Sequence, residues 1–591
     1  MIRAGYEGLK QAKDDFDPQS GKEFRPYAMQ RIRQAILDQE RAMAFAPRMT
    51  ISKSKARFSA FKPIELVSGG FAKLVGLVSN VACSRSYEFR LPGKMLTLGE
   101  GFISLTNPIG DSAPYDSRQT TRFSEFSENE FLKPENAPFS TFSVDVDTAS
   151  YSVMRRYLTE RNERPPADAV RLEEFINYFR YDYAPPTDGK PFATYVDVAA
   201  CPWNASNLLA RVALKGKEFP QDDRPSVNLV FLIDVSGSMG GENRLPLVKK
   251  AMIELTEMLT EHDRVGIVTY ADNTRVLLPS VSGREKRAII DSIDELSAGG
   301  CTYAGGIQEA YKLARKYFTK EGQNRVILCT DGDFNVGATS DDELQKLIEK
   351  EAKNGVFLTV LGFGMGNHND QMLKILSTKG KGNYGYIDTI DEARKLLIEG
   401  LTGTLITIAK DVKIQIDFNP AKVGAYRLLG YENRKMRDED FHNDKVSAGD
   451  IGAGHNVTAL YEIVPVGVAI PGGVDKSRYA DANPGTAPST ASSPAPLGDT
   501  PFSDELMYVK LRYKAPDGDK SELLEMPVAV QTVTMSSDFE FAAAVTLFGM
   551  LLRDSHYSGD GTWDTVLELA KPGDDKYRLE FLELVKKAST I

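Results

Sequence analysis

The feature that most constrains this chain is the stretch at residues 228–239, where an apolar run ends in one acid and two hydroxyls. Five of the six residues at 229–234 are apolar, a pattern typical of a strand buried on both faces of a parallel sheet. Asp234, Ser236 and Ser238 follow at its carboxyl end, the edge at which open α/β sheets bind ligands. These residues have two interpretations at this point: a ligand site, or caps for the helix expected at 243–260.

The residues around this stretch predict a parallel sheet wrapped by helices. Strand-like runs at 229–233, 265–270, 325–330 and 356–362 alternate with helical patterns near 243, 304, 340 and 391. The carboxyl ends of such strands lie side by side. Asp331 directly follows the run at 325–330, and Thr302 precedes the helix that starts near 304. Three separate segments are therefore expected to bring oxygen atoms to one rim.

In order and spacing, Asp234, Ser236, Ser238, Thr302 and Asp331 resemble the metal-ion-dependent adhesion site (MIDAS) of von Willebrand factor A (VWA) domains. The resemblance implies a doubly wound, Rossmann-like fold in which the hydroxyls approach the ion and the two acids act through water. Hard oxygen donors suit Mg²⁺, with Ca²⁺ or Mn²⁺ as alternatives. An open coordination position implies a protein partner that supplies an Asp or Glu to the metal.

A wider resemblance runs from about residue 128 to the C-terminus. The motifs at 140–151, 330–336 and 430–433 are similar to one bacterial family of VWA proteins that includes envelope lipoproteins. Cys301 stands where that family usually has serine before the metal-binding threonine. The family implies no enzymatic activity and a place in the cell envelope, whereas a genuine start at Met1 would imply the cytoplasm. The run at 71–83, which ends in Cys83, resembles a lipoprotein signal read from an internal start, so a lipid anchor is the expected route to a membrane.

Residues 3–42 resemble the second conserved region of bacterial sigma factors, through the motifs at 7–18 and 32–36. That family opens promoter DNA with aromatic residues. Gln30 and Arg31 stand where a tryptophan pair is expected, which removes the surface on which an unpaired base would stack. Promoter opening is therefore not expected, although a transcription-linked regulator is kept as an alternative function.

The expected architecture is multidomain, with a central VWA domain inserted into a flanking β-sandwich and with helical N- and C-terminal segments. Strand patterns occur both before and after the α/β segment, which favours an insertion. The predicted divisions are 1–45, a sigma-like helical segment; 46–125, a linker or poorly ordered stretch; 126–190, a strand and helices; 191–225 and 406–515, the two parts of the sandwich; 226–405, the VWA domain; 470–503, a flexible loop rich in Pro, Gly, Ala, Ser and Thr; and 516–591, a helical segment in which 539–553 is buried.

Composition excludes several classes of protein. A net charge of -10 over 591 residues argues against broad nucleic-acid binding. The four cysteines are widely spaced, which argues against a zinc site or a dense disulfide scaffold, and Cys329 fits a buried core. No apolar stretch reaches the roughly 20 residues that a membrane-spanning helix needs. Asp145 and Asp147 are expected on the outward face of a strand, either as a cation-binding pair or, more often for such a pattern, as solvated acids.

The leading hypothesis is a non-enzymatic, metal-dependent protein-binding module. The first alternative is a metal-dependent hydrolase or phosphotransferase with Asp234 as nucleophile. Ser236 argues against it, because it stands where such sites resembling Asp-x-Asp have a second acid, and no Gly-rich phosphate loop occurs. His262 and His368 fit solvated positions, and Asp333 fits an ordinary turn.

Overall fold

The structure is a computed structural model, and it describes residues 87–91, 94–99, 102–106, 123–220, 224–271, 273–299, 306–332, 341–364, 369–399, 406–472, 502, 504–516 and 518–591. The chain divides into two compact units, Met1–Asp116 and Ser117–Ile591. The sigma-like segment, Cys83 and most of the predicted loop at 470–503 lie outside the described residues.

The described part of the first unit is a small antiparallel sheet. It consists of β1 (Tyr87–Leu91), β2 (Lys94–Gly99) and β3 (Phe102–Thr106), paired in that order. These strands lie within 46–125, the stretch expected to be a linker or poorly ordered, and the division itself stays a prediction. The alternation of apolar and polar residues extends over only a few residues in each strand, which is too short to predict a strand from the sequence.

The central sheet of the second unit contains the strand that ends in Asp234. Its order is β12-β11-β10-β7-β8-β9, and every neighbouring pair is parallel except β8 with β9. The antiparallel edge strand was not predicted. The strands are β7 (Val227–Asp234), β8 (Arg264–Tyr270), β9 (Thr274–Ser282), β10 (Gln323–Thr330), β11 (Val356–Phe363) and β12 (Tyr384–Ile387).

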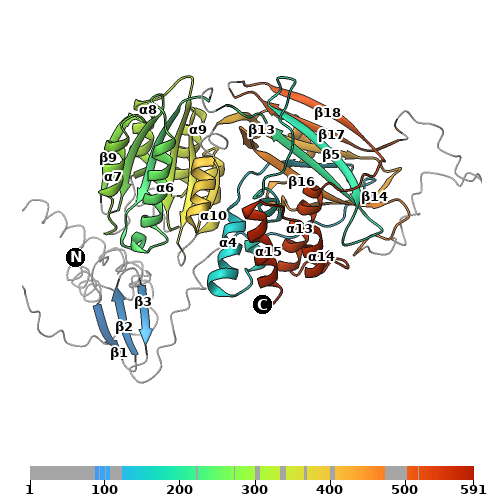
Figure 1. Cartoon of the computed structure of the whole chain (residues 1–591), viewed down its shortest axis with the longest axis horizontal. Coiled ribbons are helices and arrows are strands. Elements are labelled where there is room, and N and C mark those ends of the chain that lie inside the picture. The colour runs from blue at the N-terminus through green and yellow to red at the C-terminus, as the bar shows by residue number, and fades with distance from the viewer. Residues whose placement is uncertain are drawn as a thin grey trace, which may run out of the picture. The chain divides into compact units, whose positions relative to one another are not determined.

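Helices cover both faces of this sheet (Figure 1). Alternate residues of β7 enter two separate cores: Leu229 and Phe231 pack with α6 and α7, whereas Val230 and Leu232 pack with α8, α9 and α10. Burial on both faces explains the unbroken apolar run in β7. The helices are α6 (Leu245–Met258), α7 (Lys286–Asp294), α8 (Gly306–Lys316), α9 (Asp341–Lys353), α10 (Asp370–Lys379), α11 (Ile390–Ala393) and the π-helix η6 (Arg394–Glu399).

Two antiparallel sheets face each other across a shared apolar core. Strands from before and after the central sheet pair directly, because β6 is hydrogen-bonded to β16 and β4 to β13. One sheet contains β4 (Phe139–Ser143), β13 (Thr407–Phe418), β15 (Gly449–Gly452), β17 (Glu505–Lys514) and β18 (Ser521–Ala529); the other contains β5 (Phe192–Ala200), β6 (Leu208–Gly216), β14 (Val423–Leu429) and β16 (Asn456–Pro465). The segment 516–591 is thus not helical throughout, since it begins with β18.

A helical layer packs on the sheet of β5, β6, β14 and β16 (Figure 1). The expectation that residues 539–553 are buried is confirmed over α13, which is apolar around its circumference. The layer contains α4 (Ala149–Arg156), η2 (Tyr157–Arg161), η3 (Ala167–Ala169), α5 (Leu172–Ile176), α13 (Ser537–Leu552), α14 (Trp563–Leu569) and α15 (Lys576–Ala588). Within the part of the chain that the structure describes, no helix has the length and apolarity needed to cross a membrane.

Candidate metal centre

Asp234 and Asp331 are brought together by the pairing of β7 with β10. The two strands are parallel and Ile233 lies opposite Cys329, so Asp234 and Thr330 end them side by side. Asp331 is the next residue. Both acids are buried, at 0% and 3% exposure, whereas Ser238 is exposed. The rim therefore has an acidic floor and a hydroxyl that solvent can reach.

The turn after β7 directs its polar groups toward one another. The Ser236 backbone N–H donates to Asp234 Oδ1 at 2.8 Å, and the Ser236 and Ser238 hydroxyl oxygens lie 3.0 Å apart. Ser236 precedes the short 3-10 helix η5 (Gly237–Gly240), but its side chain caps no backbone N–H, and α6 begins only at Leu245. The helix-cap interpretation of these serines is therefore wrong.

The electrostatics of the two acids fit a cation. Asp331 Oδ1 is buried and accepts no hydrogen bond from any residue that the structure describes. Burial, followed by the charge of Asp331, raises the pKa of Asp234 to about 7, although hydrogen bonds from Ser236 and Tyr270 oppose the rise. Two carboxyls in a buried site repel each other unless a positive charge lies between them. A hard divalent ion would offset the repulsion between the two carboxylates and would give Asp331 Oδ1 a partner.

Other predicted residues fall outside the described part of the chain. Thr302, Cys301, Asp333 and His368 all lie there, so the hydroxyl of Thr302 stays a prediction. His262 is exposed, with a side-chain exposure of 77%, as expected for a solvated residue.

Two residues near the rim were not found from the sequence. Tyr270 ends β8 beside Asp234, and Arg244 lies in the loop before α6, with Nη1 3.3 Å from Asp331 Oδ2. The adjacency of β7 and β8 could have indicated Tyr270, because the strand ends are neighbours. No spacing rule indicates Arg244, since a long side chain in a loop can point in many directions.

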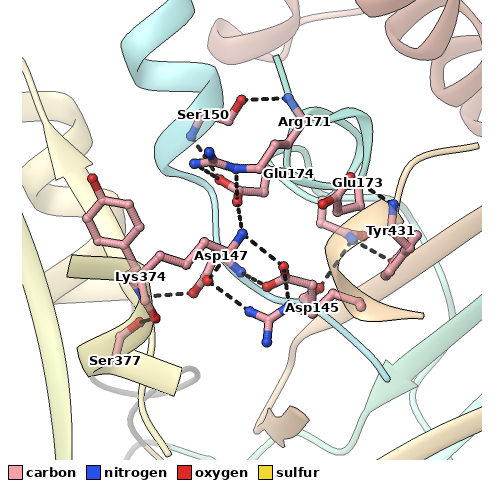
Figure 2. Close-up of polar contacts among 12 residues, drawn as sticks. Asp145, Asp147, Ser150, Arg171, Glu173, Glu174, Lys374, Ser377 and Tyr431 are labelled. Carbon is pink, nitrogen blue, oxygen red and sulfur yellow. Dashed lines mark hydrogen bonds and ion pairs between the residues drawn. The ribbon is translucent and has the colours of Figure 1, made fainter. Parts of the chain in front are cut away.

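A second cluster of acids corrects the expectation for Asp145 and Asp147. Strand β4 ends at Ser143, and both acids are buried at 3% exposure rather than solvated. Together with Glu174, they place one oxygen each within 4.8 Å of one another, as ligands of a metal would. Figure 2 shows that cations already lie among them.

Lys374 holds the centre of this cluster. Its Nζ lies 3.2 Å from Asp145 Oδ2 and 3.8 Å from Asp147 Oδ2, and it also contacts Glu174 (Figure 2). Arg434 Nε donates to Asp145 at 2.8 Å, and its Nη2 donates to Asp147 at 3.2 Å. An ammonium group thus occupies the place that an ion would take. The cluster is an ion-pair network and not a metal site.

A cleft of about 400 Å³ lies elsewhere, between the helical layer, the paired sheets and the edge of the central sheet. Its lining includes Lys395. Burial lowers the pKa of Lys395 to about 7, and its Nζ contacts the carbonyl oxygen of Tyr178. Neither Asp234 nor Asp331 lines this cleft. The rim and the cleft are therefore separate features of the molecule.

The fold and the rim define a class of protein. Residues 228–397 match the family model described as von Willebrand factor type A domain, and residues 117–211 match one described as von Willebrand factor. The chain thus contains a VWA domain, and such domains typically mediate protein interactions and commonly bind a divalent metal at a MIDAS.

Outside the VWA domain, residues 403–591 match the family model described as "Uncharacterized protein YfbK, C-terminal". The chain is 41% identical over 484 residues to the Escherichia coli (strain K12) protein "Uncharacterized protein YfbK", which covers 80% of this chain and 82% of that protein. The chain belongs to the YfbK family.

More distant similarities concern the VWA part. "Uncharacterized protein sll0103" of a Synechocystis strain is 31% identical over 189 residues, which is 31% of this chain and 43% of that protein. A solved structure of proximal thread matrix protein 1 from the mussel byssus, with a zinc-occupied MIDAS motif, is 22% identical. It covers 30% of this chain and 46% of that chain, with a TM-score of 0.25.

Proposed function

We propose that this protein is a non-enzymatic binding module that captures a protein partner through a divalent metal held at the rim of its VWA domain. The observation that carries the proposal is the pair of buried acids on adjacent strands, Asp234 and Asp331, with Asp331 Oδ1 left without a hydrogen bond among the described residues. An oxygen that is buried and unpaired costs about 1–3 kcal/mol, and coordination or a metal-bound water would remove that cost.

Each rim residue has a role in the proposal. Ser236, Ser238 and Thr302 would bind the ion through their hydroxyls, and Asp234 and Asp331 would hold it mainly through water. Mg²⁺ is proposed because neutral hydroxyls and few direct carboxylates suit a hard octahedral ion, with Ca²⁺ or Mn²⁺ as alternatives. When bound, the ion supplies a coordination position to which an Asp or Glu of the partner can add. The exposed Ser238 lies on the side from which that acid would arrive.

The domain boundaries belong to the same proposal. We infer that 226–405 is one VWA domain inserted between two parts of a β-sandwich, 191–225 and 406–515. The pairing of β6 with β16 supports the insertion, because strands on both sides of it complete one sheet. β4 and β18 extend the sandwich beyond these bounds, since they pair with β13 and β17. The cell-envelope location and the sigma-like segment remain predictions from resemblance.

The hydrolase alternative is weaker at this site. Asp234 has 0% exposure, and its Oδ1 accepts the Ser236 N–H at 2.8 Å. A nucleophile must approach the reacting atom directly, and a carboxylate in this position could not do so without a rearrangement of the turn.

The test is a calorimetric titration of the full chain with MgCl₂ and with MnCl₂. Wild type should bind one ion, and Asp234→Ala should lose that binding while keeping its circular dichroism spectrum. Asp291→Ala is the matched control, because Asp291 is an acid on the surface of α7 with a side-chain exposure of 68%. The same three proteins would then be used as bait in the presence of Mg²⁺ or chelator. An ion bound equally well by Asp234→Ala, or a partner retained equally well in chelator, would refute the proposal.

A further inference from the structure

Arg244 is placed over the rim by two contacts of one guanidinium nitrogen, Nη1. Its Nη1 lies 3.3 Å from Asp331 Oδ2 and donates to the backbone carbonyl of Ser238. The side chain is 20% exposed, so the guanidinium is only partly solvated. Arg244 therefore links the two segments that carry the proposed ligands, the turn after β7 and the end of β10.

A glycine makes room for this side chain. Gly364 follows β11 with φ +68, and a Cβ at that position would overlap the Arg244 side chain. The Gly364 carbonyl also accepts a hydrogen bond from the Tyr386 hydroxyl, which fixes the backbone beneath the arginine. Gly364 thus leaves the space that the stem of Arg244 fills, because a Cβ there would overlap the Cγ, Cδ and Nε atoms of the arginine in its present position.

We propose that Arg244 is a built-in counter-ion of the metal rim: its guanidinium competes with the divalent ion for Asp331 and sets how tightly the rim holds metal. This inference rests on the proposed metal-binding function and deepens it. A guanidinium stays charged at any pH at which the protein is folded, so Arg244 itself adds no pH dependence to the competition. The affinity of the rim for metal then depends on whether Arg244 pairs with Asp331 or with another carboxylate, such as that of an arriving partner.

The size of the effect follows from charge and distance. A divalent ion bound near Asp331 would lie within about 6 Å of a guanidinium that is itself in contact with that acid. At the dielectric constant of water, repulsion between charges of +2 and +1 at about 6 Å weakens binding about 10-fold, and partial burial increases the effect. Removal of the guanidinium charge also leaves Asp331 Oδ2 available to the ion.

The experiment compares Mn²⁺ affinity, by isothermal titration of the full chain at pH 7.5, in five proteins: wild type, Arg244→Gln, Arg275→Gln, Gly364→Ala and Asp234→Ala. Arg244→Gln keeps most of the length but removes the charge, and its Kd for Mn²⁺ should fall about 10-fold below that of wild type. Arg275→Gln is the matched control. It removes the same charge from β9 of the same sheet, where Arg275 is 62% exposed and pairs with Glu295 at 3.2 Å, and its Kd should stay within twofold.

Gly364→Ala tests the placement without changing any charge. Its methyl group should displace the arginine, so its Kd should shift in the same direction as that of Arg244→Gln, provided that circular dichroism shows a native fold. If wild type binds Mn²⁺, Asp234→Ala does not, and the Kd of Arg244→Gln is equal to or higher than that of wild type, only the role of Arg244 is overturned. Failure of every protein to bind Mn²⁺ would overturn the metal rim and this inference together.

Discussion

Replacement of Lys374 by methionine should destabilise the protein far more than replacement of its neighbour Lys379. Lys374 lies in α10 and contacts Asp145, Asp147 and Glu174, with only 14% of its side chain exposed (Figure 2). Methionine keeps the apolar stem of the side chain and removes only the ammonium. The comparison therefore measures the charge.

The magnitude can be worked from the surrounding charges. Five buried acids surround three cations in this network: the acids are Asp145, Asp147, Glu173, Glu174 and Asp370, and the cations are Arg171, Lys374 and Arg434. Removal of one cation leaves an uncompensated buried carboxylate, which costs about 3–5 kcal/mol. Lys379 is 42% exposed and pairs with Glu349 at 2.5 Å, so its loss should cost no more than about 1 kcal/mol.

The assay is urea unfolding at 25 °C and pH 8, followed by circular dichroism, for wild type, Lys374→Met and Lys379→Met. The free energy of unfolding should fall by several kcal/mol in the first variant and remain near wild type in the second. At pH 5.5 the deficit of Lys374→Met should shrink, because carboxyls whose pKa values are raised can accept protons in place of the lost cation. Equal losses of unfolding free energy in the two variants would refute the interpretation of this network as a stabilising buried ion-pair network. A stability deficit of Lys374→Met that grows as the pH falls would refute it as well.

Two further predictions concern buried acids. Burial, with the charge of Asp145, raises the pKa of Asp147 from 3.8 to about 7, so the folded protein holds a proton between those values that the unfolded chain releases, and stability falls as the pH rises through that window. In Asp147→Asn this pH dependence should be lost, changing the stability difference from wild type by on the order of 3 kcal/mol between pH 4 and pH 8; parallel pH profiles would contradict it. Asp263 accepts the Val227 N–H at 3.0 Å and the Thr260 N–H at 2.7 Å, and it pairs with the buried Arg224. Asp263→Ala should lower the free energy of unfolding by about 3–5 kcal/mol, with Asp291→Ala as the exposed control, and equal urea midpoints for the two variants would count against it.

The sequence predicted the rim because its information is local. An apolar run buried on both faces, followed at once by Asp234 and two serines, places a strand end and the proposed metal ligands within twelve residues. Parallel pairing then brings Asp331 beside Asp234, since strands of alternating α/β units share one direction. Burial of α13 was likewise evident, because its apolar residues cover the whole circumference.

The charge network could not be predicted in the same way, because its partners are far apart in the chain. Asp145 pairs with Lys374 and Arg434, which lie 229 and 289 residues away. Alternation of polar and apolar residues around Asp145 reads as a strand with a solvated face, and nothing local distinguishes an acid in water from one buried beside a lysine. Arg244 was missed for a related reason, since its position depends on Gly364 and on the end of a distant strand.

The rim lies within the VWA domain, whereas the charge network joins Lys374 and Asp370 of that domain to residues outside it, and this separation bears on how the domain could act. The network fastens α10, on one face of the sheet, to the segment after β4 and to Arg434 near β14. The rim lies at the ends of β7 and β10, in the middle of the sheet. Arg156 of α4 reaches the Tyr386 hydroxyl, which in turn donates to the carbonyl of Gly364, the platform of Arg244. Contacts from outside the VWA domain therefore extend to Arg244, the residue that would control metal affinity. A partner bound at the rim would then act on a VWA domain that is held rigidly against the rest of the second unit, and not on one attached by a flexible linker.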